Sequence, residues 1–154
     1  MNLKFLLEKY AVSPRILEIA DKLLLPGPKQ IVTKGISGSL KSFLFSALYS
    51  NSKLVGYNHL LILEDAEEAA YLFNDLEQLV APIDLFYFPS SFKTNKNFKI
   101  QSSSHVMLRT EALTRLAIGG NKKIIVTYPE ALIEKVADAA SLSSNIISIK
   151  VNAK

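Results

Sequence analysis

Residues 35–42 read Gly35-Ile36-Ser37-Gly38-Ser39-Leu40-Lys41-Ser42 and follow the phosphate-loop pattern G-x-x-x-x-G-K-[ST] at every position but one. Leucine stands at position 40, where the pattern requires glycine. An intact loop points backbone N–H groups at phosphate from a helix N-terminus, and the glycine before the lysine lets the backbone come close. We therefore expect the Leu40 side chain to fill the phosphate space. Gly35, Gly38, Lys41 and Ser42 would then be the remains of an inactive cofactor-binding loop.

Short apolar segments alternate with helical patterns on both sides of this loop. The apolar segments predict strands over 29–34, 58–63, 84–88, 123–127 and 144–151. The spacing and the capping residues predict helices over 3–11, 14–25, 40–50, 66–80, 105–118 and 129–137. Residues 89–104 are polar and are predicted to form a loop. The alternation predicts the α/β class, with a mainly parallel sheet and helices on both faces, of the RecA-like P-loop helicase type.

The 154 residues suffice for one domain with a core of its own. We expect an N-terminal helical segment over 1–25 and the α/β domain over 26–154. A predicted strand runs almost to the last residue, so we expect the chain to be a fragment of a longer protein. Without cysteine, the chain has no disulfide, thiolate zinc site or cysteine nucleophile. No apolar run approaches the ~20 residues that span a bilayer, so we expect a cytoplasmic protein without membrane contact.

Residues that often carry catalysis have plainer roles in this sequence. Glu64 and Asp65 end an apolar segment, where an active ATPase would place magnesium ligands. They also precede a helix, where Asp65 serves as the N-terminal cap and Glu67 and Glu68 favour the helix dipole, and we adopt this interpretation. The two histidines have no partner motif for a metal or a catalytic dyad. We expect no catalytic residue and no metal site.

Basic and aromatic residues alternate in the predicted loop. Such a pattern holds single-stranded nucleic acid by phosphate contacts and base stacking. The alternative is a solvated loop whose phenylalanines lie against the sheet. The candidate nucleic-acid residues are Phe92, Lys93, Lys96, Phe98 and Lys99. On the helix that follows, Arg109, Glu111 and Arg115 are interpreted as a solvated face.

Several segments resemble a known family. Gly35–Ser42 and Leu61–Ala70 are similar to the first two helicase motifs of the nucleotide excision repair protein UvrB, and 86–89 and 125–132 resemble its later strands. The strings LEDAEEAAYLFNDLEQL (63–79) and IIVTYPEALIEKV (124–136) resemble the N-terminal UvrB-like region of bacterial transcription-repair coupling factors, the Mfd family, in its Bacteroides-type forms. The resemblance covers about residues 15–150.

The resemblance implies a scaffold and not an enzyme. Family members are DNA translocases that remove stalled RNA polymerase and recruit the damage sensor UvrA in transcription-coupled repair. Their UvrB-like region lacks ATPase activity, ATP and magnesium belong to a motor downstream, and UvrA is contacted by the adjoining subdomain. By this resemblance the region is expected to support UvrA recruitment and to restrain the motor by contacts with other domains. UvrB's long aromatic hairpin has no counterpart in the short 89–104 segment. Two alternatives stay open: an active ATP-binding helicase or kinase-like enzyme, and a single-stranded DNA-binding module.

Overall fold

The structure is a computed structural model that describes residues 3–95, 98–120, 122–136 and 138. The predicted strand 144–151 lies outside these residues. The α-helices are α1 Leu3–Ala11, α2 Pro14–Leu24, α3 Leu40–Ser50, α4 Ala66–Glu77, α5 Ser103–Ala117 and α6 Pro129–Leu132. The strands are β1 His59–Ile62, β2 Leu85–Tyr87, β3 Phe92–Asn95, β4 Phe98–Gln101 and β5 Ile124–Thr127. Short 3-10 turns span Ser52–Leu54 and Pro82–Asp84.

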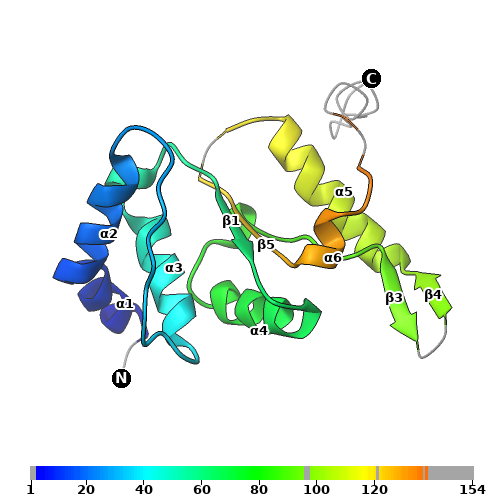
Figure 1. Ribbon diagram of the computed structural model, residues 1–154, viewed down its shortest axis with the longest axis horizontal. Helices are drawn as coiled ribbons and strands as arrows, with labels where there is room; N and C mark the ends of the chain where they lie inside the picture. Colours follow the sequence, from blue (N-terminus) through cyan, green and yellow to red (C-terminus); the bar gives the residue numbers. More distant parts are fainter. Residues whose placement is uncertain (1–2, 96–97, 121, 137, 139–154) are drawn as a thin grey trace, which may run out of the picture.

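The α/β class and the parallel sheet are confirmed in the described part of the chain. Three parallel strands lie in the order β1-β5-β2, with Leu60 opposite Ile125 and Phe86 opposite the same Ile125 on its other side (Figure 1). All four residues of β5 are buried. A strand with neighbours on both edges and cover on both faces favours such β-branched residues.

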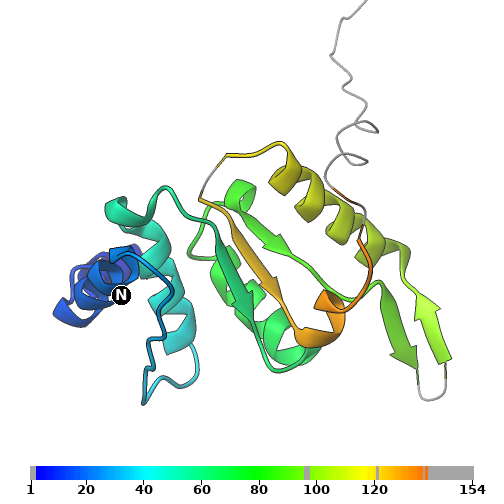
Figure 2. The same cartoon turned by 45° about the horizontal axis from the view of Figure 1, so that its top comes forward.

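The two long helices that follow β1 and β2 cover opposite faces of the sheet. Successive residues of a strand point to opposite faces, so Tyr87 faces away from Phe86 and Phe88. The centres of the Tyr87 ring and of the Phe73 ring of α4 are 5.3 Å apart, whereas the Phe88 ring contacts Arg109 of α5. Figure 2 shows α4 behind the sheet and α5 along its opposite side. Along β1 this second face stays open, with Leu60 and Ile62 about half exposed.

Helix α3 joins two hydrophobic cores. Its side chains Leu44, Ala47 and Leu48 are buried with Ile16 and Ala20 of α2. Farther along α3, Tyr49 is buried in the larger core that the sheet forms with α4 and α5. Helix α2 begins as predicted, because the Ser13 side chain caps it by accepting a hydrogen bond from the Ile16 N–H. The helical segment at the N-terminus is thus continuous in its packing with the helix that follows the glycine-containing loop.

The predicted strand over 29–34 is wrong. These residues form no strand, and Val32 is 71% exposed. The apolar pair Ile31 and Val32 gave a strand pattern, but neither residue is buried in a core. Ordering a segment as a strand costs conformational entropy, and a segment that buries no apolar side chain gains little free energy to offset that cost. The glycine-containing loop therefore does not leave the end of a strand, as a phosphate loop does.

The predicted loop over 89–104 is also wrong, because it contains the antiparallel pair β3 and β4. The register places Phe92 opposite Gln101 and Thr94 opposite Lys99. Figure 1 shows this hairpin extending away from the sheet. Polar composition concealed it, because the alternation of apolar residues that marks a strand is weak over 89–104. Two predicted helices are shorter than expected, with α4 ending at Glu77 and α6 at Leu132.

Candidate functional site

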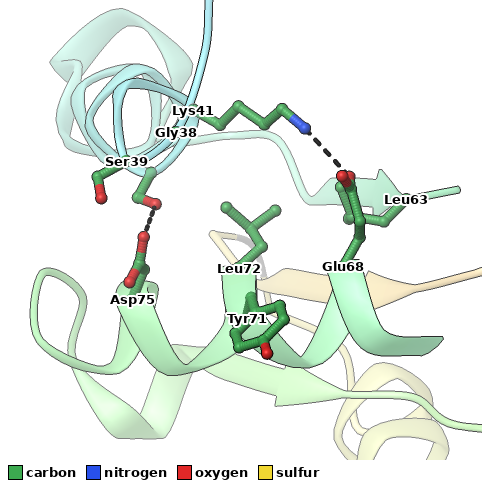
Figure 3. Close-up of a pocket in the computed structure, with 9 residues that line it drawn as sticks. Gly38, Ser39, Lys41, Leu63, Glu68, Tyr71, Leu72 and Asp75 are labelled. Atoms are coloured by element: carbon green, nitrogen blue, oxygen red, sulfur yellow. Dashed lines mark hydrogen bonds and ion pairs between the residues drawn. The ribbon is translucent and has the colours of Figure 1, made fainter. Parts of the chain in front are cut away.

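A cavity of about 330 Å³ lies between the N-terminal end of α3 and one face of α4 (Figure 3). The predicted loop supplies one wall with Gly38, Lys41 and Ser42. Helix α4 supplies the other, with Glu68, Tyr71, Leu72 and Asp75 spaced so that they share one side of the helix. The loop that would hold a nucleotide's phosphates thus faces two carboxylates of the same chain.

The lysine of the loop is paired with a carboxylate. Lys41 Nζ lies 3.1 Å from Glu68 Oε2, and both side chains are partly exposed (Figure 3). Glu68 is held at this position by the start of α4, because its N–H donates to Asp65 Oδ1 at 2.8 Å. The predicted capping role of Asp65 is confirmed. Glu68 gives Lys41 the negative partner that a phosphate would otherwise provide.

The serine of the loop is committed to a second carboxylate. Ser42 Oγ donates to Asp75 Oδ2 at 2.7 Å, and Ser42 is 1% exposed (Figure 3). A magnesium ligand in an active phosphate loop must reach a metal beside the phosphates. In this chain the hydroxyl instead links α3 to α4, and it is buried as part of the contact between those helices.

The backbone N–H groups at the start of α3 also have partners within the loop. Leu40 N–H donates to the Ser37 carbonyl at 3.3 Å, and Lys41 N–H donates to the Gly38 carbonyl at 3.2 Å. Gly35 and Gly38 have φ angles of 77° and 55°, a region that glycine enters at little cost. The N–H groups of Leu40 and Lys41 therefore donate to carbonyls of the same loop and are not directed at a ligand.

The steric role expected of Leu40 is not what the structure shows. Leu40 is the first residue of α3, has no positive φ and does not line the cavity. Its side chain is 38% exposed. Glu68 and Asp75 line the cavity instead, where they are paired with Lys41 and Ser42.

The second predicted set of site residues lies on the hairpin. Phe92 is 41% exposed and lies opposite Gln101, whereas Lys99 lies opposite Thr94. Lys93 and Phe98 fall at the alternate positions of the ribbon, so the five predicted residues do not share one face. Lys96 and the side chains of residues 93–100 lie outside the described part of the structure.

A buried polar cluster that the sequence did not reveal lies at the carboxyl ends of β2 and β5. Arg109, predicted to be solvated, is only 6% exposed. Its Nη1 donates to the carbonyls of Pro89 and Ala131 at 2.8 and 2.9 Å, and its guanidinium carbon lies 4.2 Å from the centre of the Phe88 ring. The sequence did hold one indication that Arg109 is buried. Arg109 and Ala112 are three residues apart, so they share a helix face, and Ala112 is buried.

Glu134 completes this cluster. Its carboxylate accepts hydrogen bonds from the Ser90 hydroxyl and from the hydroxyl and N–H of Ser91, and it lies 3.6 Å from Arg109 Nη1. Burial alone would raise the pKa of Glu134, but the hydrogen bonds from Ser90 and Ser91 together with Arg109 lower it below its usual value. Burial lowers the pKa of Arg109, with Glu134 acting in the opposite direction.

No family model, curated protein or solved structure matches this chain. Within the described residues, no group of three or more acidic or histidine side chains is placed to hold a metal. None of the helices in the same ranges has the length and apolar character needed to cross a bilayer.

Proposed function

We propose that the chain is a non-catalytic, UvrB-like scaffold module of a bacterial transcription-repair coupling factor. The observation that carries the proposal is the engagement of Lys41 with Glu68 and of Ser42 with Asp75. Both residues of the loop that would act on a nucleotide have partners within the chain. A folded α/β module that has replaced its ligand contacts in this way serves by presenting surfaces to other proteins.

The further parts of the proposal come from the sequence resemblance. The fold would be a reduced form of the RecA-like helicase type, in which the strand before the phosphate loop has been lost. The module would belong to a cytoplasmic DNA repair protein whose downstream motor binds ATP and magnesium. Its partners would be other domains of that protein, UvrA through the adjoining subdomain, and RNA polymerase and DNA through the whole protein.

The proposed scaffold role is tested on the longer protein by its ATPase rate. Removal of residues 1–154 is expected to raise the rate, because contacts that restrain the motor are lost. Lys41→Ala in the full-length protein is expected to leave the rate unchanged, since Lys41 pairs with Glu68 and takes no part in hydrolysis. An unchanged rate on removal would contradict the restraint. A large loss with Lys41→Ala would instead favour the alternative of an active ATP-binding enzyme.

A further inference from the structure

A second cavity, of about 230 Å³, lies beside the buried Arg109. It is remote in sequence from the phosphate loop and takes no part in the proposed scaffold role. Its polar lining consists of Ser91, Gln101, Arg109, Thr110 and Lys135. Ser91 and Gln101 stand at the base of the β3–β4 hairpin, so the cavity adjoins the carboxyl end of β2. In open α/β sheets, ligands bind outside the carboxyl ends of the strands.

Arg109 is held in one orientation with part of its donor capacity unused. Nη1 is fixed by the Pro89 and Ala131 carbonyls, and the Phe88 ring supports the guanidinium plane. Nη2 is buried and has no hydrogen-bond partner among the described residues. An unsatisfied buried donor is rare in native proteins, and a bound ion or an ordered water is a common explanation.

The charges near the cavity favour an anion. Arg109 and the exposed Lys135 are positive, and the carboxylate of Glu134 already accepts hydrogen bonds from Ser90 and Ser91. The chain carries a net charge of +4, which attracts anions over a longer range. Arginine offers a planar fork and lysine a mobile point charge, and this pairing suits phosphate oxygens.

We infer that the cavity lined by Arg109, Lys135 and Ser91 is a phosphate-binding site. Arg109 Nη2 and the Lys135 ammonium would donate to phosphate oxygens, while the Ser91 hydroxyl keeps its hydrogen bond to Glu134. The phosphate comes from one of two sources: the free anion, or the backbone of a nucleic acid that runs past the hairpin.

The test is an NMR titration of the full chain with sodium phosphate, with sodium chloride added to keep the ionic strength constant. Saturable shifts are expected at the amides of Ser91, Gln101 and Thr110 and at the Arg109 side-chain Nε–H. Lys135→Gln should weaken binding about fivefold, the equivalent of about 1 kcal/mol for an exposed ionic contact. Arg15→Gln removes an exposed charge from α2 and should leave binding unchanged.

A second titration, with a short oligothymidylate, identifies the source. Shifts at the same amides at much lower concentration than with inorganic phosphate would assign the site to nucleic acid, and saturation by inorganic phosphate alone would assign it to the free anion. The proposal is overturned if neither ligand gives saturable shifts at these positions, or if Lys135→Gln and Arg15→Gln weaken binding equally. Arg109→Lys, which keeps the charge but lacks Nη2, should abolish the shifts in protein that remains folded by circular dichroism.

Discussion

Among single residues, Lys41 and Ser42 show the largest difference between the role that the phosphate-loop motif gives them and the contacts that they make. The motif requires both side chains to be free for a ligand, yet each is paired with a carboxylate of α4. The Lys41–Glu68 pair is partly exposed, so it contributes at most about 1 kcal/mol to stability. The bond from buried Ser42 to Asp75 matters more for packing, because it fixes the distance between α3 and α4.

Ser42→Ala is expected to lower the free energy of unfolding by about 1 kcal/mol, because Asp75 loses the hydroxyl that it accepts from in the part-buried helix contact. Urea denaturation followed by circular dichroism measures the change. Ser39→Ala is the matched control, since Ser39 is exposed and makes no capping bond. Equal effects of the two substitutions would show that the Ser42 hydroxyl does not link the helices.

Arg109→Leu is expected to cost about 3 kcal/mol, because two backbone carbonyls lose their donor and Glu134 loses its nearby cation. Arg115→Leu, on the exposed side of the same helix, should change stability by less than about 0.5 kcal/mol. Thermal and urea unfolding of both variants make the comparison. Similar small losses would place Arg109 in solvent, as the sequence first suggested.

His59 gives the chain a pH-dependent stability. Burial lowers its pKa, so between the folded value and the unfolded value of about 6.5 the unfolded chain binds more protons. The contribution of His59 to the free energy of unfolding is therefore complete above about pH 6.5, and it is lost as the pH falls toward the pKa of His59 in the folded chain. Urea unfolding from about pH 7.5 to 5.5 should show this decline, and His59→Leu should remove it. If the free energy of unfolding falls with pH in the same way in His59→Leu, other groups cause the decline. His105→Gln is the control and should keep the decline.

Among the elements, most of the helices and strands were predicted well from sequence, and two segments were not. The strand β5 and the helices α3 and α4 lie close to their predicted positions, because burial and caps mark their patterns. The strand predicted at 29–34 was wrong because Ile31 and Val32 are not buried, and the loop predicted at 89–104 was wrong because its polar sequence does not mark the β3–β4 pair. The same limit applies to the site: the motif located the loop, but only the packed structure brings Glu68 and Asp75 to it.

Hydrogen exchange tests the status of the 29–34 segment. The amides of Ile31, Val32 and Thr33 are expected to exchange rapidly, since this segment belongs to no strand. The amides of β5, the central strand, should be among the most protected in the chain. Protection at residues 31–33 comparable to that in β5 would mean that the segment pairs with the sheet.

For the whole molecule, helix α3 is the element that contacts both the N-terminal helices and α4. Helix α3 connects the N-terminal helices to the sheet, and its contacts with α4 include the two pairs that line the cavity. The loop is therefore part of the packing that unites the two cores. Lys41 and Ser42 both have structural partners on α4.

Isothermal titration of the chain with magnesium-ATP tests this account most directly. We expect the titration to be the same in the natural chain, in Leu40→Gly and in Lys41→Ala, because Lys41 and Ser42 are paired with Glu68 and Asp75 and any phosphate binding takes place at Arg109 and Lys135. Saturable binding at micromolar ATP that is lost in Lys41→Ala would contradict the account.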